Sequence, residues 1–79
     1  MKKILVIEDE PEMRRNLLTI LKLERFDALG AEDGRAGLRL AKQAKPDLIL
    51  CDVMMPNVDG YGVLKQLRED PDTATIPFV

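Results

Sequence analysis

The stretch Lys3-Ile-Leu-Val-Ile-Glu-Asp-Glu-Pro11 joins a short apolar run to an abrupt acidic ending. The run from Ile4 to Ile7 is rich in β-branched residues, which is typical of a strand buried on both faces of a parallel sheet. Acidic residues suit the start of a helix because the helix dipole favours negative charge there. Proline suits the same place because its missing backbone N–H would have no partner in the first turn. The stretch therefore predicts a buried strand followed at once by a helix.

The same alternation continues along the chain. Apolar residues spaced three and four apart predict amphipathic helices, and short apolar runs between them predict strands. After the first strand we expect a helix from 13 to about 23, a strand from 26 to 31, a helix from 36 to 44, a strand from 47 to 51, a helix around 63–67 and the opening of a fourth strand at 76–79. This order, βαβαβα with a partial β, predicts an α/β fold with a doubly wound parallel sheet and right-handed crossovers.

The composition limits the classes of function. A chain of 79 residues forms one small domain, and its net charge of −2 without a basic block gives no support for nucleic-acid binding. Its apolar runs are far shorter than the roughly 18 residues that cross a bilayer, and the N-terminal run is too short for a signal peptide. We therefore expect a cytoplasmic protein with no membrane contact.

The reactive side chains are few in kind. The chain has no histidine and one cysteine, Cys51, which excludes an internal disulfide, a Cys/His zinc site and a histidine-assisted nucleophile within the chain. We interpret Cys51 as a small core residue. Chemistry must then come from carboxylates, hydroxyls, lysines or a hard cation.

Three carboxylates follow two of the expected strands. Glu8 and Asp9 come after the first strand, and Asp52 comes after the third. Ligands of open parallel sheets bind beyond the carboxyl ends of the strands, so these side chains converge if the two strands are neighbours. Clustered carboxylates repel one another unless a cation lies between them, and their oxygens suit Mg²⁺, or Mn²⁺. Asp52 is ionised at neutral pH and could attack phosphorus without a general base.

A purely structural interpretation stands beside this one. Acidic residues between a strand and a helix are often caps, and a single aspartate after a strand is often a turn residue. We interpret Glu10 as a helix-start residue, and Asp33 and Asp47 as cap or turn residues. The combination of two acids after strand one, one after strand three and a loop with Pro56 and Gly60 favours a site.

These residues carry a family resemblance. Lys3-Ile-Leu-Val-Ile-Glu-Asp-Glu-Pro11 and Asp47-Leu-Ile-Leu-Cys-Asp-Val-Met-Met-Pro-Asn-Val-Asp-Gly60 resemble the receiver domain of two-component response regulators, as do Ala31-Glu-Asp-Gly34 and Ala74-Thr-Ile-Pro-Phe-Val79. The resemblance implies a flavodoxin-like sheet of order 2-1-3-4-5. It also implies a phosphoryl acceptor that is served by a sensor histidine kinase or a phosphotransfer protein. The implied roles are acceptor for Asp52, metal ligands for Glu8, Asp9, Asp52 and the backbone carbonyl of Met54, and loop shaping for Pro56 and Gly60.

The family pattern continues past Val79, with a Ser or Thr after strand four and a Lys after strand five. We therefore expect residues 1–79 to be a truncated receiver domain without an output domain, able to bind metal but impaired in phosphorylation and switching. Because an apolar strand left at a sheet edge tends to pair with another chain, we also expect a homo-oligomer. Its predicted contact is Ile76, Pro77, Phe78 and Val79.

Two other functions compete with a phosphorelay receiver, which is not itself a turnover enzyme. One is an interaction or assembly module of the same fold that has no phosphoryl chemistry. The other is a phosphatase or phosphomutase with an aspartyl nucleophile, whose general-acid aspartate would stand two residues after Asp52. That position is Met54, which argues against the enzyme.

Overall fold

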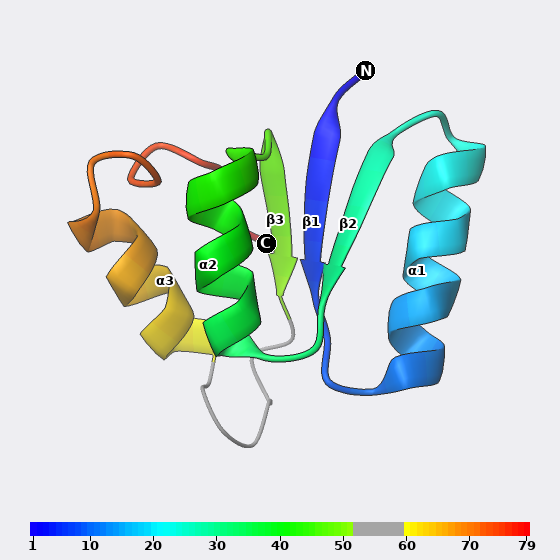
Figure 1. Ribbon diagram of the computed structural model, residues 1–79, viewed down its shortest axis with the longest axis horizontal. Helices are drawn as coiled ribbons and strands as arrows, with labels where there is room; N and C mark the ends of the chain where they lie inside the picture. The colour runs from blue at the N-terminus through cyan, green and yellow to red at the C-terminus, as the bar shows by residue number, and fades with distance from the viewer. Residues whose placement is uncertain (52–59) are drawn as a thin grey trace.

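A computed structural model describes residues 1–51 and 60–79, which form a three-stranded parallel sheet with helices on both faces (Figure 1). The strand order is β2-β1-β3. The elements are β1 (Lys3–Ile7), α1 (Pro11–Leu23), β2 (Asp27–Ala31), α2 (Gly34–Ala44), β3 (Leu48–Cys51) and α3 (Gly60–Glu69). The predicted α/β alternation and parallel sheet are confirmed, with element bounds close to those expected.

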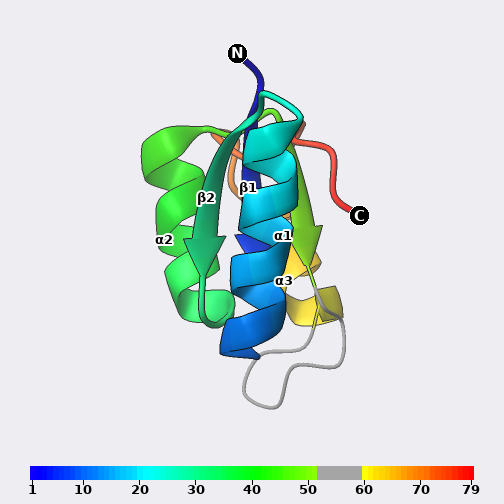
Figure 2. The same cartoon turned by 90° about the vertical axis from the view of Figure 1, so that its right-hand side faces the viewer.

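The sheet separates two layers of helix. Figure 2 shows α1 in front of one face of the sheet, with α2 and α3 behind the other face. Side chains of β1 alternate between these layers, as the period of a strand requires. Leu5 and Ile7 enter the core cluster together with Ala41, Val63 and Leu67. Ile4 and Val6 are also buried, at 4% and 1% exposure, so β1 is buried on both faces.

Acidic caps start the first two helices. The Glu10 carboxylate accepts hydrogen bonds from the backbone N–H groups of Glu12 and Met13, at 3.1 and 3.0 Å. Asp33 does the same for Ala36, at 2.9 Å. Such bonds satisfy N–H groups that the first helical turn leaves without partners. Both residues were predicted to be cap or helix-start residues, and both predictions are confirmed.

The end of the chain joins the sheet beside β3. Phe78 bridges Ile49 in parallel, and Ile49 N–H donates to the Pro77 carbonyl at 2.9 Å. Val79 N–H donates to Ile49, and Cys51 N–H donates to Val79, at 2.8 and 2.9 Å. The predicted opening of a fourth strand is therefore confirmed. Among the three strands β3 lies at the edge, and residues 77–79 pair with it only through this isolated bridge, as expected of a short fourth strand.

The outer surface of α1 differs from the sequence-based expectation. The pattern placed Met13, Leu17 and Ile20 or Leu21 on the apolar face of the helix. Leu17 and Leu21 are partly buried, whereas Met13 and Ile20 are 49% and 56% exposed. No residue of α1 is fully buried, because the helix lies mainly over β2 and β1 and only part of its surface is covered.

Among the described residues, no helix is long and apolar enough to cross a membrane.

Candidate metal and phosphoacceptor site

The strand register brings the two predicted halves of the site to one edge of the sheet. Ile7, the last residue of β1, is the partner of Cys51, the last residue of β3. Glu8 and Asp9 follow Ile7 directly, and Asp52 follows Cys51 in the sequence. The predicted neighbourhood of strands one and three is thus confirmed. Asp52 itself, with Met54 and Pro56, lies outside the described residues, whereas Gly60 begins α3.

Glu8 is held in the sheet rather than in a free loop. Its backbone N–H donates to the Ala31 carbonyl at 3.0 Å, which extends the ladder between β1 and β2 by one residue. Its side chain is only 9% exposed, and its Oε2 accepts a long hydrogen bond of 3.4 Å from the Glu10 N–H. Glu8 has polar partners in the described structure, and a carboxylate at this edge of the sheet can also interact with a cation.

Asp9 is the exposed member of the acidic pair. Its side chain is open to solvent, and it makes no hydrogen bond within residues 1–51 and 60–79. A carboxylate in this situation can approach a cation without first breaking another bond. The different surroundings of Glu8 and Asp9 are compatible with the division implied by the family resemblance, in which Asp9 binds directly and Glu8 through water.

The donor set fits a hard cation. Glu8 and Asp9 offer carboxylate oxygens only, which Mg²⁺ and Mn²⁺ prefer to soft sulfur ligands. Within the described part of the chain no three His, Cys, Asp or Glu side chains form a metal-binding group. The predicted third ligand, Asp52, lies outside that part, and Glu8 and Asp9 are the predicted side-chain ligands within it.

A cavity of about 310 Å³ opens beside this edge. Its wall is mainly apolar, with contributions from α1, from β1 and β3 and from the end of the chain. Cys51 is partly buried and packs against the core, in keeping with its interpretation as a small core residue. The lining residues are Val6, Ile7, Glu8, Leu17, Leu50, Cys51 and Val79.

Sequence reasoning missed one residue near the site. Arg14, on the first turns of α1, donates from Nη1 to the backbone carbonyl of Glu8 at 2.9 Å. Arg14 is partly buried four residues after the Glu10 cap, but this burial is a feature of the fold and residue type carries no signal for it. The pattern alone placed this arginine among the polar residues of the helix.

Comparison with known proteins identifies the class to which this fold and this acidic edge belong. The model of the response regulator receiver domain family matches residues 4–79, and the chain belongs to that family. A crystal structure of the N-terminal domain of a response regulator receiver protein from Methanoculleus marisnigri has a TM-score of 0.94 at 32% identity. It matches 99% of this chain and 63% of that one. The predicted flavodoxin-like receiver fold is therefore confirmed.

Two curated relatives show how the matched region sits in longer proteins. The chain is 44% identical to a probable transcriptional regulator, ycf27, of Porphyridium aerugineum, over 95% of its own length and 31% of the relative. It is 37% identical to protein PilH of Pseudomonas aeruginosa, over its full length and 65% of that relative. The chain thus spans between about a third and two thirds of the length of these relatives.

Proposed function

We propose that this chain is the phosphoryl-accepting part of a two-component signalling protein and that Asp52 is the acceptor. The observation that carries the proposal is the paired ending of β1 and β3 at Ile7 and Cys51, from which Glu8, Asp9 and Asp52 follow. Membership of the receiver family supports the same assignment.

The proposed reaction transfers a phosphoryl group from a phosphohistidine to Asp52. A carboxylate oxygen of Asp52 attacks phosphorus, the P–N bond breaks, and its electron pair returns to the imidazole nitrogen of the donor. An aspartate is ionised at neutral pH, so the step needs no base from a chain that lacks histidine. The product is an acyl phosphate that water can later cleave.

The remaining predicted residues hold and shape the site. Asp9 and Glu8, with Asp52 and the Met54 carbonyl, would hold Mg²⁺ or Mn²⁺. Such a cation offsets negative charge on the transferred group, which is the main requirement of phosphoryl transfer. We assign to Pro56 and Gly60 the shaping of the loop that follows Asp52.

The partner in this proposal is a sensor histidine kinase or a phosphotransfer protein, and the location is the cytoplasm. The chain acts as a signalling domain that is modified and then reset, without turning over a substrate.

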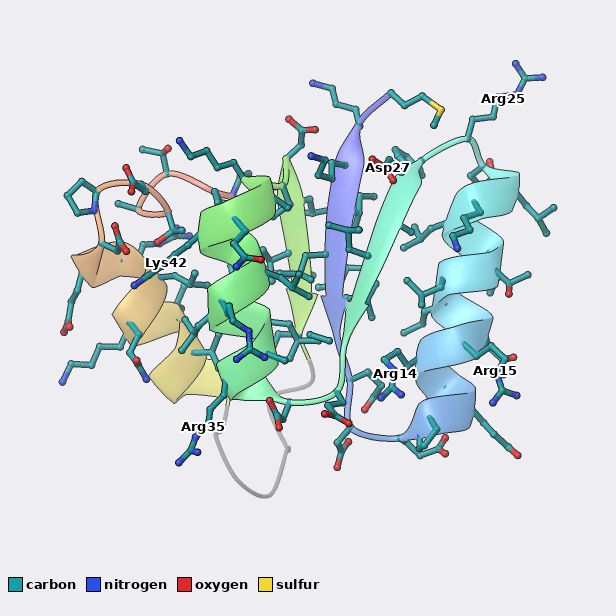
Figure 3. The ribbon with its side chains drawn as sticks, viewed as in Figure 1. Arg14, Arg15, Arg25, Asp27, Arg35 and Lys42 are labelled. Atoms are coloured by element: carbon teal, nitrogen blue, oxygen red, sulfur yellow. The ribbon has the colours of Figure 1, made fainter. Side chains whose placement is uncertain are left out.

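Labelling with acetyl phosphate in the presence of Mg²⁺ tests the acceptor. The parent chain should gain one phosphoryl group by intact mass, and Asp52→Asn should gain none. Asp27→Asn is the matched control. Asp27 lies opposite Lys3 in the strand register, at the amino end of the strands and away from the proposed site (Figure 3). Equal labelling of Asp52→Asn and the parent would remove Asp52 as the acceptor.

A second candidate function, self-association through the C-terminal edge, is favoured by one observation. Pro77 and Val79, the neighbours of Phe78, make the hydrogen bonds to β3. The N–H and C=O of Phe78 itself therefore face away from β3, and they have no partner within the described residues. Val79 beside it is 70% exposed, whereas Ile76 is only 8% exposed and belongs to the core. An edge of this kind favours pairing with a second copy.

The mass in solution, measured by light scattering over a range of concentrations, tests this candidate. We expect a dimer whose association weakens in Val79→Asp, because a charge at an edge opposes strand pairing. Leu23→Asp is the control, since Leu23 is equally apolar and 77% exposed but lies on α1. A chain that remains monomeric at micromolar concentration would exclude the proposal.

A further inference from the structure

Arg14 links α1 to the acidic end of β1. Its Nη1 donates to the Glu8 backbone carbonyl at 2.9 Å, and the bond is partly buried. Figure 3 shows the Arg14 side chain reaching from α1 toward the sheet edge where β1 ends, while Arg15 extends away from the sheet. The guanidinium therefore contacts the backbone of the turn that carries Glu8 and Asp9, and the neighbouring arginine does not.

The stem of Arg14 lies against a strand position without a side chain. A Cβ atom placed on Gly30 of β2 would lie 3.3 Å from Arg14 Cδ and 3.4 Å from its Cγ. The same Cβ would lie 2.9 Å from Leu18 Cδ1, so a side chain at this position would displace Leu18 first and would also press on the stem of Arg14. Gly30 thus lets the aliphatic part of Arg14 cross the strand closely, and this packing fixes the direction in which the guanidinium points.

Other bonds anchor the turn on either side of the Glu8 carbonyl, including the one from the Glu10 N–H to Glu8 Oε2 at 3.4 Å. Glu8 N–H is tied to Ala31, and the Glu10 carbonyl accepts the first helical bond, from Arg14 N–H at 2.9 Å. The orientation of the peptide that joins Glu8 to Asp9 is fixed on its carbonyl side by Arg14. A rotation of that peptide would redirect the Asp9 side chain, because the peptide plane sets the backbone geometry of the residue that follows.

We propose that Arg14 is a positioning residue for the metal-binding turn, one that acts through the Glu8 carbonyl and does not touch the cation itself. The proposal rests on the proposed function, in which Glu8 and Asp9 hold a divalent cation. Groups that orient metal ligands from outside the coordination sphere typically change metal affinity by about 10- to 100-fold when removed.

The sign of the effect separates positioning from simple electrostatics. A guanidinium near a cation repels it, so the loss of charge alone would make Mg²⁺ bind more tightly. The loss of positioning would make Mg²⁺ bind more weakly, since the ligands would no longer be held in place. Positioning and electrostatics thus predict opposite changes for the same substitution.

The experiment measures Mg²⁺ affinity by calorimetry for the parent, Arg14→Met, Arg14→Lys and Arg15→Met. Methionine keeps most of the aliphatic stem and removes the donors, and Arg15→Met removes an equal charge one residue away. We expect Arg14→Met to bind Mg²⁺ about tenfold more weakly than the parent, and Arg15→Met to bind as tightly or slightly more tightly. Arg14→Lys, which keeps a donor, should recover part of the loss.

A second readout needs no metal. Amide hydrogen exchange at Asp9 and Glu10 in metal-free protein should become faster in Arg14→Met and stay unchanged in Arg15→Met, because the turn loses an anchor. A purely stabilising role would raise exchange throughout the core instead. Affinity in Arg14→Met that equals or exceeds that of the parent, or a lysine variant weaker than the methionine variant, would overturn the proposal. A parent that binds no Mg²⁺ would instead refute the proposed metal site.

Discussion

Ile7 and Cys51 are partners in the final position of the β1–β3 register, so the two strands end side by side. Glu8 and Asp9 follow Ile7 in the sequence, and Asp52 follows Cys51, so both chain segments leave the sheet at the same edge from adjacent strands. The chain carries a further acid at this edge, Glu32, which follows the last residue of β2. Substitution of Glu32 can therefore separate the effect of direct metal ligation from the effect of negative charge at this edge.

Asp9→Asn should weaken Mg²⁺ binding at least about tenfold, because an amide oxygen carries no net charge and is a poorer ligand for a hard cation. Glu32→Gln removes the same charge from the same edge, and we expect a change below about twofold for this exposed acid. Calorimetric titration of both variants checks the prediction. Equal losses in the two variants would mean that Asp9 acts only through the field of the edge.

Gly37→Ala should destabilise the fold, although alanine favours helices over glycine by about 1 kcal/mol. A Cβ at this buried position of α2 would overlap Ile7 Cδ1 and would lie 2.7 Å from Ile7 Cγ1. Ile7 is 1% exposed and cannot move outward, so we expect a net loss of about 1–3 kcal/mol, as for other overpacked cores. Urea unfolding checks the prediction. Ile7→Val removes the nearer atom, so the double variant should lose less than the sum of the single variants.

The layers of the fold were predictable because local signals agreed with one another. The β-branched run of β1, the Glu10 and Asp33 caps and the apolar spacing of the helices all favoured one arrangement. The pairing of residues 77–79 with β3 was expected from the likeness of these residues to the fourth strand of the receiver family, whose order places strand four beside strand three. Periodicity alone says nothing about such a short stretch.

The candidate site was predictable to a lesser degree. Acidic residues after strands one and three pointed to one edge, and the register agrees with that expectation. Arg14 escaped notice because its role depends on a backbone carbonyl and on the space above Gly30, and residue type encodes neither. The exposure of Met13 and Ile20 escaped notice for a similar reason, since the apolar pattern of a helix does not state how much of the helix the sheet covers.

Thr73→Val should lower the free energy of unfolding by about 0.5–1.5 kcal/mol, the net value of one hydrogen bond, because the Leu67 carbonyl keeps only a long bond of 3.4 Å from the Asp70 N–H. The Thr73 hydroxyl is fully buried and donates to the Leu67 carbonyl of α3 at 2.7 Å. This bond ties the end of the helix to the segment that leads into the pairing with β3. Thr75→Val is the control, since Thr75 is exposed and should change stability little. Equal unfolding midpoints for parent and Thr73→Val would contradict this role.

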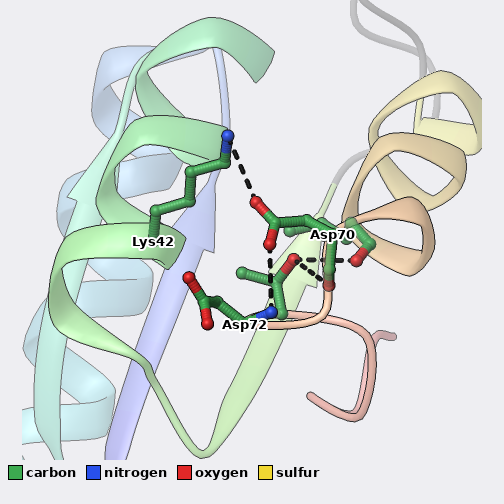
Figure 4. Close-up of polar contacts among 5 residues, drawn as sticks. Lys42, Asp70 and Asp72 are labelled. Atoms are coloured by element: carbon green, nitrogen blue, oxygen red, sulfur yellow. Dashed lines mark hydrogen bonds and ion pairs between the residues drawn. The ribbon is translucent and has the colours of Figure 1, made fainter.

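Asp70→Asn should make the chain less stable at neutral pH, with a difference that disappears in acid. The pKa of Asp70 is held below its ordinary value of 3.8, first by the hydrogen bond from the Asp72 N–H at 3.0 Å and then by Lys42, whose Nζ lies 3.2 Å from Oδ2 (Figure 4). A lowered pKa in the folded state means that ionised Asp70 stabilises the fold above pH 3.8. That contribution is lost as the pH falls through the lowered pKa.

Urea midpoints of the parent and Asp70→Asn, measured between pH 7 and pH 2.5, follow this loss. Asparagine can still accept from the Asp72 N–H, so the comparison isolates the charge of Asp70. Lys42→Met should reproduce only part of the difference, because the backbone donor, which is the larger cause of the lowered pKa, remains. Added salt should shrink the Lys42 part, since the Lys42 side chain is 59% exposed to solvent. A difference between parent and Asp70→Asn that stays constant down to pH 2.5 would show that the charge of Asp70 does not stabilise the junction of α2 and α3.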